Sequence, residues 1–243
     1  NGCLTSTFNF GYLWEDYRGT PLFMGAEIEW LTPQSEYRPT EYMQGWMKFW
    51  FDADKRLIAA KKFQQARIEF IRTTWAKDRD LKSEGFDISA PEITQALNFF
   101  ERRIPDLTKV GDLLLSEAQM TKQLYKFAAT CTNYADFSRH HGESDLANNF
   151  LNHGNYLAYG LAACTLWVLG IPHGFAVMHG KTRRGALVFD VADLIKDAVV
   201  LPWAFICAKE NATEQEFRQQ ILQKFTEHKC LDFMFNEVKG IAL

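Results

Sequence analysis

The chemically most informative stretch of the chain is the segment 175–193, FAVMHGKTRRGALVFDVAD. An apolar run leads to His179, a loop rich in glycine and basic residues follows, and a second apolar run leads to Asp190 and Asp193. If a helix begins near Asp190, the two carboxylates lie three residues apart on one helix face. One imidazole and one or two carboxylates can therefore meet beside a cationic loop.

These side chains have the donor types of a divalent metal site. A hard ion needs oxygen ligands and open positions for water and phosphate, so the set fits Mg²⁺ or Mn²⁺ better than structural Zn²⁺. Lys181, Arg183 and Arg184 in the loop can hold a DNA backbone without reading its sequence. Other interpretations stay open: His179 can be a core residue with a satisfied ring, Asp190 a helix cap, and the basic loop a solvated turn.

A third metal ligand has to come from another helix, and Glu117 is the candidate because it interrupts the apolar turn 113–118. A carboxylate on a buried helix face is costly unless it is paired or bound to a metal. An ion pair with Lys122 or with a neighbouring helix is the alternative explanation. The residues 180–182, GKT, imitate the end of a P-loop, but the first glycine of GxxxxGK[ST] is missing, which excludes a P-loop NTPase.

The composition of the 243 residues, 47% hydrophobic and 14% aromatic, is that of a globular protein rather than a disordered one. The formal charge of −3 means that any nucleic acid is bound by a local patch. Five scattered cysteines without a CxxC pair argue against a disulfide framework and fit a reducing cytoplasm. We expect no membrane segment and no export signal, and a chain that begins at Asn1 suggests a fragment of a longer protein.

The elements that must position these side chains change in character along the chain. Residues 1–32 favour extended structure and predict the remnant of a β domain, and the polar stretch 33–40 predicts a linker. Apolar spacing of three and four predicts an α-helical domain over 41–243, so the fold class is α+β and mainly α. Expected helices include one capped by Ser89, followed by others at 113–126, 145–169, 190–209 with a break before Pro202, and 213–226.

Three motifs in the chain resemble a known family. NHGNYLAYG at 152–160 and IPHGFAVMHGKTRRGALVFDVADLIKD at 171–197 resemble the CRISPR-associated adaptation integrases, which are also called endonucleases. WLTPQSEYRPTEYM at 30–43 resembles the F subtype of type I systems in particular. The similarity runs from about residue 20 to residue 242, so it covers nearly the whole chain.

The resemblance implies an N-terminal β domain, largely truncated here, and a larger α-helical catalytic domain with a single-metal site. Glu117, His179 and Asp193 match the metal ligands of the family. Asp190 matches a neighbouring acid that supports catalysis, and Tyr159 matches a tyrosine near the active site, which we group with the basic loop as a DNA contact.

The implied reaction is a transesterification, in which the 3′-hydroxyl of a short DNA fragment attacks a phosphodiester at the edge of a CRISPR repeat. Water is the alternative nucleophile. The resemblance also implies a homodimer, bridged by a second adaptation protein that in this subtype is usually fused to a helicase-nuclease, in a prokaryotic cytoplasm. Two competing hypotheses are a catalytically silent DNA-binding scaffold and a structural helical protein with a cationic loop.

Overall fold

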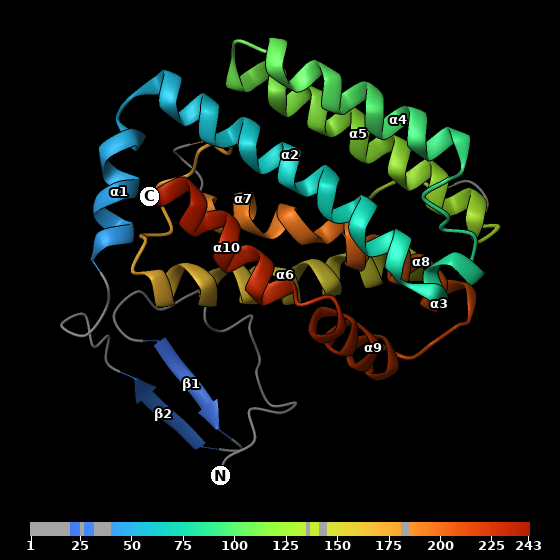
Figure 1. Ribbon diagram of the computed structural model, residues 1–243. Coiled ribbons are helices and arrows are strands. Elements are labelled where there is room, and N and C mark those ends of the chain that lie inside the picture. Colours follow the sequence, from blue (N-terminus) through green and yellow to red (C-terminus); the bar gives the residue numbers. More distant parts are fainter. Residues whose placement is uncertain (1–19, 25–26, 32–39, 135–136, 141–144, 181–184) are drawn as a thin grey trace.

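A computed structural model describes residues 20–24, 27–31, 40–134, 137–140, 145–180 and 185–243. Its larger part is a packed set of helices (Figure 1), as the sequence predicted. These helices are α1 (Glu41–Trp50), α2 (Ala53–Lys77), α3 (Arg79–Ser83), α4 (Pro91–Arg103), α5 (Val110–Cys131), α6 (Leu146–Leu169), α7 (Ala186–Ile195), α8 (Leu201–Lys209), α9 (Glu214–Glu227) and α10 (Cys230–Ala242). A 3₁₀ turn, η3 (Ile104–Asp106), follows α4, and a π-helix, η4 (Lys196–Val200), joins α7 to α8. None of the helices in the described ranges is long and apolar enough to cross a bilayer.

The N-terminal part contains one hairpin of two antiparallel strands, β1 (Thr20–Met24) and β2 (Glu27–Leu31). Thr20 lies opposite Leu31, and Met24 lies opposite Glu27. A hairpin followed by helices confirms the α+β, mainly α fold class. Residues 32–39 lie outside the described ranges, so the division into 1–32, 33–40 and 41–243 stays a prediction.

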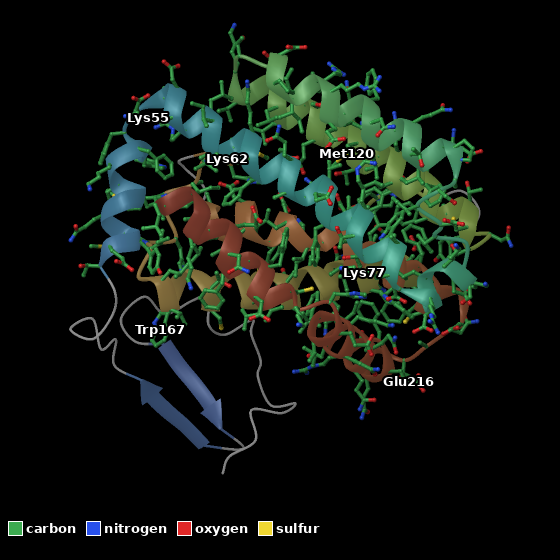
Figure 2. All side chains as sticks on the ribbon, viewed as in Figure 1. Lys55, Lys62, Lys77, Met120, Trp167 and Glu216 are labelled. Carbon is green, nitrogen blue, oxygen red and sulfur yellow. The ribbon has the colours of Figure 1, made fainter. Side chains whose placement is uncertain are left out.

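Helix α7 is the centre of the helical domain. It packs against α2 on one side and α6 on the other (Figure 1), and every residue of α7 is buried. The side of α2 that carries Lys55, Lys62 and Lys77 is exposed (Figure 2), whereas Phe63 and Ile71 point into the core. A buried helix is expected to be apolar all round. The acids of α7 are therefore the exception that needs a chemical explanation.

Two glycines allow helices to approach more closely than a side chain would permit. A Cβ on Gly154 in α6 would lie 2.5 Å from a methyl carbon of Val200 in η4. A Cβ on Gly45 in α1 would lie 1.7 Å from the carbonyl oxygen of Ala242 at the end of α10. Both contacts are shorter than van der Waals separation, so glycine is required at each crossing.

The structure corrects three helix boundaries. Helix α7 begins at Ala186, after Gly185 in the left-handed region with φ +62°, so Asp190 lies in the middle of a helix and is not a cap. Ser89 does not cap α4, because that helix starts at Pro91 and Ser89 donates its hydroxyl to Asp87 instead. Helix α5 extends beyond the predicted 113–126 at both ends.

The predicted break before Pro202 takes the form of the π-helix η4, which interrupts the α-helix between α7 and α8 while the chain stays helical. Pro202 has no N–H, so in an α-helix the carbonyl of Ala198 would lack its donor four residues on. The indole Nε1 of Trp75 in α2 donates to that carbonyl at 2.9 Å. A side chain from another helix thus replaces the missing backbone donor and ties α2 to η4.

Candidate active site

Asp190 is the fixed point around which the segment before α7 is arranged. Its carboxylate is fully buried and accepts the backbone N–H groups of Val177 at 2.7 Å, Met178 at 3.1 Å and His179 at 3.1 Å. The fourth contact is with the ring Nδ1 of His179, at 2.6 Å. A carboxylate acceptor keeps the proton on Nδ1 and leaves the Nε2 lone pair free for another partner. Asp190 therefore orients His179 and has both oxygens engaged.

Helix α1 holds the same segment from the other side. The indole of Trp46 donates to the carbonyl of Phe175 at 3.0 Å, and the indole of Trp50 donates to the carbonyl of Ala176 at 2.8 Å. These backbone groups have no helix or strand partner, so the two tryptophans satisfy them. The position of His179 thus depends on α1 as well as on Asp190.

Burial alone would lower the pKa of His179. The hydrogen bond to Asp190 and the negative charges of Asp193, Asp190 and Glu117 outweigh that effect and raise the pKa above its usual value. Three acids from two helices are therefore close enough to act on one imidazole.

Glu117 reaches the site from α5 and is held by Arg67 of α2. The guanidinium is buried and donates from Nη1 to Glu117 at 2.7 Å, from Nη2 to Thr121 at 3.0 Å and from Nε to Asp197 at 2.7 Å. Burial would lower the pKa of Arg67, but Asp197 and Glu117 hold it well above its usual range. The neighbouring-helix alternative for Glu117 is thus present, with Arg67 rather than Lys122 as the partner.

Asp193 is buried on α7, and Lys196 of η4 is its ion-pair partner. Burial raises the pKa of Asp193, but the charges of Lys196, Arg67 and His179 more than reverse this and lower it. Oδ1 of Asp193 lies against the Lys196 ammonium, and no other group in the described part of the chain donates to it. A buried carboxylate oxygen whose polar partner is a lysine ammonium can accept a metal ion in place of that ammonium.

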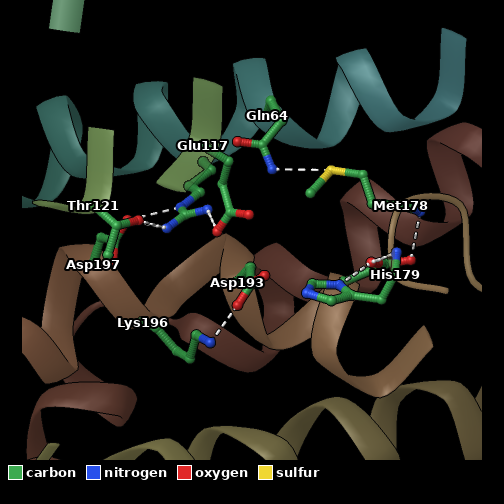
Figure 3. Close-up of polar contacts among 10 residues, drawn as sticks. Gln64, Glu117, Thr121, Met178, His179, Asp193, Lys196 and Asp197 are labelled. Carbon is green, nitrogen blue, oxygen red and sulfur yellow. Dashed lines mark hydrogen bonds and ion pairs between the residues drawn. The ribbon is translucent and has the colours of Figure 1, made fainter. Parts of the chain in front are cut away.

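Figure 3 shows the Glu117 and Asp193 carboxylates and the His179 ring directed toward a common space, with Glu117 above Asp193 and His179 beside them. Two carboxylates and one imidazole are the donor types of a Mg²⁺ or Mn²⁺ site. In the described residues no three His, Cys, Asp or Glu side chains already form a metal-holding group. Arg67 and Lys196 contact the two carboxylates, and the donors fit such an ion in type and direction. An ion bound to Oδ1 of Asp193 would take the position of the Lys196 ammonium.

Comparison with known proteins decides the family. The family model described as CRISPR associated protein Cas1 matches residues 28–229. A relative from Pectobacterium atrosepticum named CRISPR-associated endonuclease Cas1 is 54% identical over 230 residues, which cover 92% of this chain and 71% of the relative. The chain belongs to the Cas1 family.

Two solved structures agree with the Cas1 fold. A Cas1 protein from Thermotoga maritima superposes with a TM-score of 0.68 at 14% identity, covering 88% of this chain and 73% of that one. A casposase bound to an integration product superposes with a TM-score of 0.65 at 15% identity, covering 89% and 71%. At these identities the likeness concerns the fold.

The DNA contacts predicted for this Cas1-family chain are only partly described. Lys181, Arg183 and Arg184 lie outside the described residues. Tyr159 is half-buried beside the site, with its ring centroid 4.8 Å from that of Phe189 and 5.3 Å from the Lys196 ammonium.

Arg67, Lys196 and Asp197 contact the predicted site residues or each other, and none of the three was predicted from the sequence. Asp197 and Lys196 follow Asp193 by four and three residues, so a helix continued past Asp193 places them on its face. Arg67 falls on the buried stripe of α2, one turn after Phe63 and one before Ile71. A charged residue within a row of apolar residues was the sequence signal that could have identified Arg67 as a buried, paired cation.

Proposed function

We propose that this Cas1-family chain is a DNA endonuclease and integrase that depends on Mg²⁺ or Mn²⁺ held by Glu117, His179 and Asp193. The observation that carries the proposal is the convergence of these three side chains from α5, from the segment before α7 and from α7 itself (Figure 3). The endonuclease name of a relative 54% identical to the chain supports the same chemistry.

The bound ion would polarise a phosphodiester and stabilise the charge that develops on its oxygens. The side chains of this protein hold the proposed metal ligands in position beside the phosphate. Asp190 holds the His179 ring with Nε2 available to the site, and Arg67 fixes the Glu117 carboxylate. These groups are held by partly buried hydrogen bonds, so little reorganisation is needed during the reaction.

The reaction we propose is the joining of a short DNA fragment to the edge of a CRISPR repeat. The 3′-oxygen of the fragment forms the new bond to phosphorus, and the bond from phosphorus to the 3′-oxygen of the repeat strand breaks and leaves a free hydroxyl. Attack by water at the same phosphate gives nuclease activity. A casposase with this fold is known bound to an integration product, which is consistent with that chemistry.

The interface and assembly follow from the same proposal. Lys181, Arg183 and Arg184 hold phosphates next to the scissile one, and Tyr159 contributes the contact nearest the metal. The working unit is a homodimer with a second adaptation protein, fused to the helicase-nuclease of the F subtype, in the cytoplasm.

Replacing His179 or Asp193 with alanine tests the proposal. Each variant should lose joining of a labelled DNA fragment to repeat DNA in Mn²⁺ by at least about 100-fold, because electrostatic stabilisation of this kind contributes that much. Asp106, exposed in η3, provides the matched control, and Asp106→Ala should join normally. Full joining by both site variants would overturn the proposed site, whereas a wild type that joins no DNA would favour the silent scaffold.

A further inference from the structure

Among the described residues, Lys196 and Arg67 are the cations that contact the carboxylates of the site, and the structure holds them in different ways. Arg67 donates through all three of its nitrogens to Asp197, Glu117 and Thr121, and its side chain is 2% exposed. Within the part of the chain that the structure describes, Lys196 makes one ion pair, to Asp193, and its side chain is 19% exposed. The planar guanidinium of Arg67 is fixed by its several partners, whereas the Lys196 ammonium, on a flexible four-carbon side chain, can change position.

The contact between Lys196 and Asp193 is required in the absence of a metal. Asp193 is buried, and among the described residues the Lys196 ammonium is the polar group that contacts its Oδ1. Without a cation beside it, this carboxylate would be an uncompensated buried charge, which proteins rarely tolerate. The ammonium therefore stands where a metal bound to Asp193 would stand.

An ammonium and a divalent cation at one oxygen repel each other, and the site is largely shielded from water, so an ion on Oδ1 of Asp193 favours departure of the ammonium. Arg67 is buried and held by three partners, so it cannot move away, but the Lys196 ammonium has the Tyr159 ring as an alternative partner nearby. The Tyr159 ring lies 5.3 Å from its Nζ, and an aromatic face attracts a cation. The ammonium can thus leave Asp193 while its backbone stays in η4.

We propose that Lys196 is a built-in counter-ion, which occupies the cation position on Asp193 in the metal-free protein and is displaced when the divalent ion binds. This inference rests on the proposed metal site. Metal binding is then an exchange of cations on Asp193. The ion pair between Lys196 and Asp193 stabilises the metal-free protein, and the need to break this pair lowers the affinity for the divalent ion.

The test compares the wild type with Lys196→Met, which keeps the stem and removes the charge, and Lys196→Arg, which keeps the charge. Titration calorimetry with MnCl₂ alone, without DNA, gives the dissociation constants. Lys196→Met should bind Mn²⁺ at least about tenfold more tightly than wild type, because a competing and repelling unit charge is gone. Lys196→Arg should not bind more tightly. In EDTA, Lys196→Met should melt at a lower temperature than wild type.

A measurement on the unmodified protein covers the case in which Lys196→Met does not fold. Acetylation of lysines, followed by mass spectrometry, should label Lys196 several-fold faster in MnCl₂ than in EDTA, because the ion frees the ammonium. Lys82 of α3, with a side chain 65% exposed, should be labelled equally in both.

The outcomes separate this inference from the proposed function. A wild type that binds Mn²⁺, with Lys196→Met binding no more tightly and Lys196 labelling unchanged, overturns the counter-ion alone. A wild type that binds no Mn²⁺ overturns the metal-dependent function and the counter-ion together.

Discussion

Replacing Asp190 with asparagine tests how the site is positioned, because the change keeps the shape of the side chain and removes its charge and one acceptor. In the wild type, Oδ2 accepts the N–H groups of Val177 and Met178, while Oδ1 accepts the N–H of His179 and contacts its ring Nδ1. An asparagine has one oxygen and one NH₂ group. One of these two pairs of donors must therefore face another donor.

Both orientations of the amide are unfavourable. With NH₂ in place of Oδ2, the N–H groups of Val177 and Met178 lose their acceptor. With NH₂ in place of Oδ1, the ring Nδ1 of His179 must become an acceptor, which moves the ring proton to Nε2 and removes the lone pair offered to the site. A hydrogen bond to a charged acceptor contributes about 1.5–3 kcal/mol, so we expect the free energy of unfolding to fall by about 2–4 kcal/mol.

Urea unfolding and Mn²⁺ titration measure the two consequences of Asp190→Asn. The affinity for Mn²⁺ should fall by about 10–100-fold, as is usual when the partner of a ligating histidine is changed. Asp232, exposed in the first turn of α10, gives the control, and Asp232→Asn should change stability by less than about 0.5 kcal/mol. Wild-type stability and wild-type Mn²⁺ affinity in Asp190→Asn would refute the orienting role.

Two further predictions concern charges outside the proposed ligands. Arg67→Lys keeps the charge, but a lysine cannot reach all three partners of Arg67. Urea unfolding should therefore show a free energy of unfolding lower by about 2–3 kcal/mol. The same change at Arg72, a more exposed residue of α2, should have a smaller effect, and equal losses in the two variants would contradict the argument. Burial raises the pKa of Asp78, but the Leu81 N–H and the His228 and Lys224 side chains lower it overall. Its ionised form therefore stabilises the protein above about pH 4, and this contribution is lost as pH falls through the lowered pKa. The stability difference between wild type and Asp78→Asn should shrink below that pH, and a difference that grows in acid would disprove this.

The sequence was sufficient where the signal is local. The helix predicted at 145–169 agrees with α6 almost to the residue, and in the structure Asp145 caps it by accepting the N–H of Asn148. The start of α7 was missed for a physical reason. Its apolar residues are buried on every side, so they show no 3.6-residue periodicity, and the helix was predicted to begin only near Asp190.

The partners within the site could not be predicted in the same way. Arg67 is one of many basic residues on α2, and only the packing of α2 against α5 and η4 shows that it lies between Glu117 and Asp197. These partners are 50 and 130 residues away in sequence. Local periodicity indicates that a charge is buried, but the tertiary fold determines which charge compensates it.

The π-helix links the stability of the fold to the charges of the site. Lys196 and Asp197 are its first two residues, and they contact Asp193 and Arg67 respectively. Pro202 deprives Ala198 of an α-helical donor, and Trp75 supplies one from the same helix that carries Arg67. Two independent contacts thus join α2 to η4, one through a backbone carbonyl and one through an ion pair. Because the carbonyl contact fixes the backbone, the Lys196 side chain can exchange partners without moving the helix that carries it.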